Sequence, residues 1–92
     1  MLPRSDPLLH FNRGLCFQRL ERWDSSVADF GRVIALNPSF DHKAYTLRAK
    51  ALMHLQRWEE CAADCEAALR IAPADLQARG FLDFAQQHMR AE

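Results

Sequence analysis

Two cysteines and four histidines are the side chains of this sequence with the best chemistry for binding a metal ion. Cys61 and Cys65 are four residues apart, so in a helix their thiols would lie one turn apart and could begin a zinc site. No further cysteine or histidine stands near enough in sequence to complete four ligands. Because a buried cysteine is also an ordinary small core residue, we expect core packing and no metal site. The histidines are His10, His42, His54 and His88.

The cysteine count also bears on the redox environment. With three cysteines the chain cannot pair all its thiols in disulfides, and Cys16 stands alone. A disulfide between Cys61 and Cys65 is disfavoured because one rigid helical turn separates them. Free thiols are typical of a reducing compartment, so we expect a cytoplasmic, intracellular protein.

Residues that could act in catalysis do not form a recognised arrangement. The chain has three glycines, and none belongs to a phosphate-binding loop or to a turn that exposes a nucleophilic serine. His54 could titrate, although an isolated histidine is more often an ordinary exposed residue. Asp29 and Asp64 occupy equivalent positions of a repeat, which indicates a scaffold role. We therefore expect no enzymatic activity and no cofactor.

The strongest pattern is an internal repeat with a period of 35 residues. Residues 8–40 superpose on residues 43–75 without any insertion, and a period of this size is typical of repeat arrays. We therefore interpret the chain as two copies of one unit followed by a C-terminal segment. Identical pairs include Arg13 with Arg48, Leu20 with Leu55, Arg22 with Arg57, Trp23 with Trp58, Asp29 with Asp64, and Pro38 with Pro73.

Each unit has the apolar spacing of two helices. In the first unit the helices run over residues 7–20 and from about Asp24 to just before Pro38, and the second unit repeats this pattern. Gly14 and its equivalent Ala49 lie in mid-helix, where a small residue lets the two helices approach closely. Trp23 and its equivalent in the second unit stand at the turn between helices, where a large ring can fill the junction. Aspartates precede three of the helices as expected N-caps: Asp6, Asp41 and Asp75.

Residues 76–90 have the pattern of a fifth helix with a polar outer side, which suits the end of a stack of repeats. No segment alternates as a strand does, so we predict an all-α array of antiparallel helix–turn–helix repeats, an α-solenoid of five helices. We expect residues 1–6 to be a flexible N-terminus before a domain at 7–92.

The repeat resembles the tetratricopeptide repeat, a helix–turn–helix unit of 34 residues. The resemblance places repeat 1 at about 7–41, repeat 2 at about 42–75 and a capping helix at about 76–90. A pentatricopeptide array that reads RNA has a similar period, but it needs many units, one for each base. The residues that carry the resemblance are Gly14, Phe17, Leu20, Trp23, Ser26, Phe30, Val33 and Pro38, repeated as Ala49, Leu52, Leu55, Trp58, Cys61, Cys65, Ala68 and Pro73.

Charge is neutral overall but unevenly distributed. Residues 1–58 sum to +4 and residues 59–92 to −4. In the family that the chain resembles, the first helices of successive units line a concave groove. Laid on that arrangement, the groove-side helices sum to +2 and +4, and the outer helices to −1 and −3. This segregation favours an acidic or carboxylate-bearing partner, although helix-dipole preferences account for part of it. The neutral total excludes nucleic-acid binding by bulk positive charge.

The resemblance extends to co-chaperone tetratricopeptide domains, which hold the C-terminal carboxylates of heat-shock chaperones in a clamp of Lys, Asn and Arg. Asn12 and Lys43 stand where such domains have a clamp Asn and a clamp Lys. The clamp Arg would fall at Leu47, and Arg48 beside it points about 100° away around the helix. The unit that supplies the other two clamp residues is not present before residue 7, so we expect a partial clamp.

The resulting expectation is a non-enzymatic adaptor that binds a protein or peptide, including a chaperone C-terminus, in a basic concave groove. Lys43 and Asn12 would meet a carboxylate, while Leu47 and Met53 would hold an apolar side chain. The candidate peptide-binding residues are Asn12, Arg19, Lys43, Leu47, Lys50, Met53 and His54.

A different class of function is structural self-assembly. The first helix carries Leu8, Leu9, Phe11 and Leu15, and nothing in the sequence precedes it to cover this side. Such an apolar edge favours a homodimer or a place in a longer repeat array. No apolar run approaches the roughly 18 residues of a membrane span, so we expect no membrane partner.

Overall fold

The computed structural model describes residues 6–90, which form five α-helices and contain no strand. The all-α prediction is therefore confirmed. The helices are α1 (Pro7–Arg19), α2 (Trp23–Leu36), α3 (His42–His54), α4 (Trp58–Ile71) and α5 (Leu76–Arg90). Residues 1–5 of the expected flexible N-terminus lie outside the described residues, whereas Asp6 forms the N-cap of α1. Within residues 6–90, none of the helices has the length and hydrophobicity needed to cross a bilayer.

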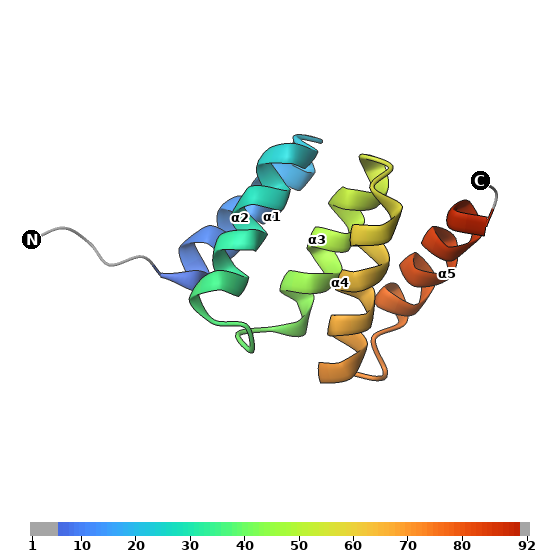
Figure 1. Ribbon diagram of the computed structural model, residues 1–92. Helices are drawn as coiled ribbons and strands as arrows, with labels where there is room; N and C mark the ends of the chain where they lie inside the picture. Colours follow the sequence, from blue (N-terminus) through green and yellow to red (C-terminus); the bar gives the residue numbers. More distant parts are fainter. Residues whose placement is uncertain (1–5, 91–92) are drawn as a thin grey trace, which may run out of the picture.

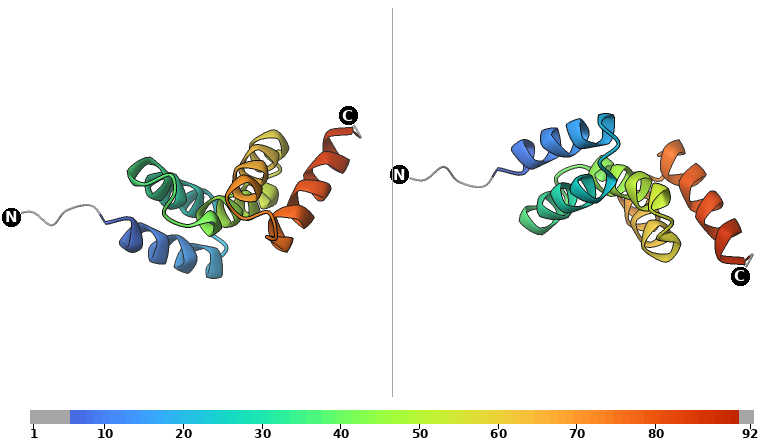
Figure 2. Two further views of the ribbon diagram at one scale, coloured as in Figure 1. Left: turned by 90° about the horizontal axis from the view of Figure 1, so that it is seen from below. Right: turned by 90° about the horizontal axis from the view of Figure 1, so that it is seen from above.

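The helices stack in chain order as two antiparallel hairpins and a final single helix (Figure 1). α1 packs on α2, α3 packs on α4, and α2 joins the two hairpins through its contact with α3. α5 packs against α4 and, to a smaller extent, against α3. The views along the other axis show α1 and α3 on one side of the stack and α2 and α4 on the other, with α1 and α5 at opposite ends (Figure 2).

Three aspartates cap the helices that begin each structural unit. A side-chain oxygen of Asp6 accepts the Leu8 N–H at 2.9 Å, and one of Asp41 accepts the Lys43 N–H at 2.9 Å. Asp75 accepts the Ala78 N–H at 3.0 Å in the same way. These bonds satisfy N–H groups that have no partner within the helix. The N-caps predicted from the sequence are confirmed.

Both hairpin turns use a residue in the left-handed conformation. Glu21 and Gln56 have φ of 57° and 59°. After each of them a backbone N–H reaches back over the end of the helix, from Arg22 to the Phe17 carbonyl at 2.8 Å and from Arg57 to the Leu52 carbonyl at 2.9 Å. This Schellman arrangement favours glycine at the left-handed position, because a Cβ is strained there.

We predict that Glu21→Gly and Gln56→Gly each raise the free energy of unfolding, by roughly 1 kcal/mol, because removing Cβ relieves the left-handed strain. Urea denaturation of each variant measures the change. Glu21→Ala, which keeps Cβ, is the control and should bring no gain. A loss of stability in both glycine variants would contradict this account of the turns.

The core consists of two clusters, one in each half of the stack. The first joins α1, α2 and α3 around Phe30, Val33 and Ala44, which are at most 1% exposed. The second joins α3, α4 and α5, and Cys61 and Cys65 lie in it with 0% exposure. The other buried members of the second cluster are Ala49, Leu52, Ala62, Ala68, Ala78, Leu82 and Ala85.

The two buried cysteines behave as core residues. A hydrogen bond with Cys61, together with burial, raises the pKa of the Cys65 thiol, so this thiol stays protonated at neutral pH. Both thiols are free. Their position on the buried face of α4 agrees with the packing role expected from the sequence.

Gly14 allows α1 and α2 to approach closely, as its place in mid-helix suggests. A Cβ built on Gly14 would lie 2.9 Å from Cζ of Phe30, whose ring is fully buried. The ring also packs edge-on against Phe11, with centroids 5.5 Å apart. Because the Phe30 ring is fixed on both sides, it cannot move aside at low cost.

We predict that Gly14→Ala is coupled to the size of residue 30. In the native background the crowding with Phe30 offsets the gain of about 1 kcal/mol that alanine has over glycine in a helix. In a Phe30→Leu background the same substitution should be more favourable by about 1 kcal/mol or more. A double-mutant cycle by chemical denaturation measures this difference, and additive effects would contradict the packing described.

Candidate peptide-binding groove

Four of the five candidate residues of α3 form one row along the helix, and Met53 lies outside it. Lys43, Leu47 and Lys50 are spaced by four and three residues, and His54 continues the row, so all four share a face. Lys43 is exposed and Lys50 is half-buried. On α1, Asn12 stands 35 residues before Leu47, at the equivalent position of the first repeat, and is exposed.

A hydrogen bond that sequence reasoning missed fixes α1 beside this row. The side-chain amide of Gln18 donates to the Leu47 carbonyl at 2.6 Å, and Gln18 is only 9% exposed. Arg19 follows it on α1 and is exposed. A polar residue among apolar neighbours on the buried side of α1 was the signal that could have indicated this bond.

The two apolar candidates are largely occupied by packing inside the protein. Leu47 is half-buried and packs against the cluster around Phe30. Met53 is half-buried and packs against the cluster that contains Leu52. The apolar surface that they offer to a peptide is therefore smaller than the sequence suggested.

His54 is stacked on a tryptophan of the preceding repeat. Its ring lies 3.9 Å from the Trp23 ring with an interplanar angle of 2°. Trp58 repeats the contact with His88 of α5, at 4.1 Å and 21°. The tryptophans thus join neighbouring repeats as well as filling the turns. One face of the His54 ring is covered, so this residue is not the isolated histidine that the sequence suggested.

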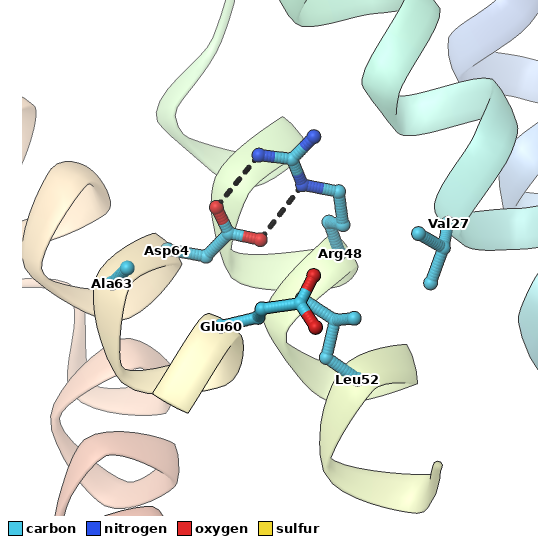
Figure 3. A pocket seen from close by; sticks show the side chains of 6 residues that line it. All are labelled: Val27, Arg48, Leu52, Glu60, Ala63 and Asp64. Carbon is cyan, nitrogen blue, oxygen red and sulfur yellow. Dashed lines mark hydrogen bonds and ion pairs between the residues drawn. The ribbon is translucent and has the colours of Figure 1, made fainter. Parts of the chain in front are cut away.

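Three arginines counted as groove cations are paired within the protein. Arg13 makes two hydrogen bonds of 2.8 Å to Asp29, and Arg48 makes bonds of 2.7 and 2.8 Å to Asp64. Figure 3 shows Arg48 turned toward Asp64, with Glu60 beside the pair. Arg57 holds that glutamate through bonds of 2.8 and 2.6 Å.

These pairs correct the charge map drawn from the sequence. The sums of +2 and +4 counted side chains by helix, although Arg13 and Arg48 reach across to acids of α2 and α4. The cations of the groove-side helices that make no ion pair within residues 6–90 are Arg19, Lys43 and Lys50. The positive charge of the candidate groove is therefore carried mainly by two lysines of α3.

A cavity of about 210 Å³ lies between α2, α3 and α4, away from the lysine row (Figure 3). Its charged groups are the paired Arg48, Asp64 and Glu60, so they are already satisfied by one another and by Arg57. We assign this cavity no role in peptide binding. Its lining residues are Val27, Arg48, Leu52, Glu60, Ala63 and Asp64.

The first ion pair is also a site of pH-dependent stability. The hydrogen bond from Arg13 holds the pKa of Asp29 below its ordinary value, against the effect of burial, and Arg32 adds a third bond of 2.8 Å. A carboxylate whose folded pKa is lowered stabilises the fold above its unfolded pKa. That stability is lost as pH falls through the folded pKa.

We predict that Asp29→Asn lowers the free energy of unfolding at pH 7 by about 2 kcal/mol, at the low end for buried pairs because Arg13 is mostly exposed and regains water. The difference from the native protein should begin to shrink below about pH 4, where the carboxyl group of the unfolded chain takes up a proton, and should be lost once pH falls through the lowered folded pKa of Asp29. Urea denaturation at pH 7 and at several acid pH values measures this. Asp24→Asn, on the exposed side of α2, is the control. A penalty for Asp29→Asn that does not change with pH would contradict the ion-pair account.

Comparison with known proteins identifies the family to which the fold belongs. The family model for the tetratricopeptide repeat matches residues 42–75. The first tetratricopeptide domain of Spaghetti (RNA polymerase II-associated protein 3), solved with the HSP90 peptide SRMEEVD, superposes with a TM-score of 0.88. It is 32% identical in sequence, over 92% of this chain and 67% of that one. The chain belongs to the tetratricopeptide repeat family.

Curated relatives agree with this assignment. Human RNA polymerase II-associated protein 3 is 34% identical over 73 residues, and a STIP1 homologue of Dictyostelium discoideum is 32% identical over 85 residues. These matches cover 79% and 92% of this chain but only 11% and 15% of the relatives. The chain thus corresponds to a small part of each relative, and like the domains it matches, it is a protein-interaction module.

Proposed function

We propose that this module binds the acidic C-terminal segment of a partner protein along the row that α1 and α3 form. The proposal rests on which cations are paired with acids inside the protein and which are not. Arg13, Arg48 and Arg57 are held by internal acids, whereas Lys43 and Lys50 share one face of α3 and make no ion pair within the described residues. Unpaired cations on one face attract and orient an acidic ligand.

Each residue of the row has a distinct task in this proposal. Lys43 contacts the terminal carboxylate, and the Asn12 amide donates a further hydrogen bond to it. Lys50, two turns further along α3, meets an acidic side chain of the peptide, and Arg19 extends the positive charge toward the end of α1. Leu47 offers its remaining exposed surface to an apolar side chain.

The related Spaghetti domain supports this choice of ligand, because it was solved with a peptide that ends in two glutamates, a valine and an aspartate. This chain has Leu47 at the place where co-chaperone clamps carry an arginine. A leucine cannot donate the two parallel hydrogen bonds of a guanidinium to a carboxylate. We therefore expect weaker binding here than in a complete clamp.

Calorimetric titration with the peptide SRMEEVD tests the proposal. Lys43→Ala should weaken binding by about tenfold, the value of one charge-assisted hydrogen bond. The same peptide with an amidated C-terminus should bind about tenfold more weakly than the free acid. Moderate salt should weaken the binding of both peptides. Arg70→Ala, on α4, removes a cation away from the row and should change nothing. Equal binding of the acid and the amide, or no effect of Lys43→Ala, would contradict the proposal.

A variant that should bind the peptide more tightly tests the same row of residues. Leu47→Arg should tighten binding of the free-acid peptide by about tenfold and leave the amidated peptide unchanged, because the guanidinium completes the carboxylate contact. Its aliphatic stem can keep the packing of the half-buried position. Ala35→Arg, exposed on α2, adds the same charge elsewhere as a control. If both variants improve binding equally, the effect is bulk charge and the assigned position is wrong.

A further inference from the structure

The side of α1 that faces away from the rest of the stack carries a row of mainly apolar residues, separate from the proposed peptide-binding row. Leu9, Arg13, Cys16 and Leu20, which we call the N-terminal edge, are spaced by four, three and four residues and so share one face. Leu9 is 62% exposed and Leu20 is 67% exposed. This face is distinct from the peptide row, which includes Asn12, and from the buried face with Gly14.

The second repeat shows what covers the equivalent face. The positions 35 residues later are Ala44, Arg48, Ala51 and Leu55, and they lie on the side of α3 that meets α2. Ala44 is 1% exposed and Ala51 is 0% exposed. The same face of α1 has no helix on it among the described residues, and it carries larger apolar side chains. By this equivalence, the exposed face of α1 has the geometry of a helix-docking surface.

The other end of the stack is more polar. The face of α5 that lies away from α4 exposes Asp83, Gln86 and Gln87, together with Gly80, next to which a Cβ would meet nothing within 4 Å. One apolar side chain, Leu76, shares this face at the start of α5 and is 84% exposed. The N-terminal edge, with an exposed leucine at each end of the row, is therefore the more apolar of the two ends of the stack.

The charge around the N-terminal edge indicates what kind of helix fits. Two guanidinium groups, those of Arg13 and Arg32, share the single carboxylate of Asp29, which leaves one positive charge in excess. Both arginine side chains remain more than half exposed, at 56% and 52%. The Nδ1 atom of His10 lies 3.7 Å from the same carboxylate.

The second repeat lacks this excess. Where the first repeat has Arg32, the second has Ala67, and where the first has Ser25, the second has Glu60. The cation excess therefore occurs only at the open face of α1 and not at the face that α2 already covers. An acid on an incoming helix would balance it.

We propose that the N-terminal edge docks an amphipathic helix of a partner protein that presents apolar side chains with a carboxylate between them. The helix lies along α1 as α2 lies along α3, with its apolar groups on Leu9 and Leu20 and its carboxylate on Arg13 and Arg32. A second copy of this chain is the less favourable occupant, because two-fold pairing of α1 would bring two positive clusters together.

Protection of Cys16 tests the proposal on the intact chain. Cys16 lies within the N-terminal edge and is exposed, whereas Cys61 and Cys65 are buried, so alkylation of the folded protein reports on this face. The probe is a synthetic helical peptide with leucines on one face and a glutamate between them. The matched peptide has lysine in place of that glutamate. We expect saturating glutamate peptide to slow Cys16 alkylation several-fold and the lysine peptide to leave the rate nearly unchanged.

Variants separate the apolar and the charged contributions. Leu9→Gln combined with Leu20→Gln should weaken binding of the glutamate peptide by about tenfold, while Leu36→Gln, which changes a 46% exposed leucine on α2, should have no effect. Arg32→Gln should reduce the preference for glutamate over lysine. Circular dichroism confirms folding, and unchanged binding of SRMEEVD to the edge variants shows that the two surfaces act separately.

Three results of the peptide experiments would overturn the proposal. These are a Cys16 alkylation rate that neither peptide changes, equal binding of both peptides, and equal losses in the Leu36→Gln control. Sedimentation of the chain alone gives a further check. A dimer that Leu9→Gln and Leu20→Gln dissociate would make a second copy the occupant and would also contradict the proposal.

Discussion

A buried carboxylate in each repeat, Asp29 in the first and Asp64 in the second, determines how the two helices of that repeat meet. The two carboxylates are 0% and 6% exposed, and a charge so far from water is tolerated only when it is paired. Each receives a two-bonded guanidinium from the helix before it, Arg13 or Arg48. The pair therefore fixes the rotation of α1 against α2 and of α3 against α4.

That rotation decides which residues are left for recognition. Arg48 is turned toward Asp64 of α4 (Figure 3). The preceding residue, Leu47, therefore stands in the row with Lys43 and Lys50. On α1 the same rotation places Asn12 in the equivalent position and leaves the N-terminal edge open. The internal ion pairs thus reduce the positive charge available to a ligand, and what remains is carried mainly by two lysines, with Arg19 on α1. A chain with no net charge can still present a small basic surface in this way.

The features that repeat within one helix could be predicted from the sequence. Apolar periodicity and the aspartate caps located the five helices, and the position of Cys61 and Cys65 on the buried stripe indicated that they pack in the core. Contacts between helices were harder to predict from the sequence, because they depend on the angle and rotation at which the helices pack. The signal for the ion pairs was present, since an arginine and an aspartate recur 16 residues apart in both units. Counting charge by helix concealed it. The stacking of Trp23 on His54 joins different repeats, so no pattern within a single unit could reveal it.

The central claim is that the ion-paired arginines are scaffold and that the lysines of α3 carry recognition. Nuclear magnetic resonance of the chain during titration with SRMEEVD tests this directly, because a guanidinium held in an ion pair gives an observable Nε–H signal. The account predicts that the amide signals around Asn12, Lys43 and Lys50 shift on binding, while the Nε–H signals of Arg13 and Arg48 stay in place. Shifts concentrated on α2 and α4, or displacement of the Arg48 Nε–H signal by the peptide, would contradict it.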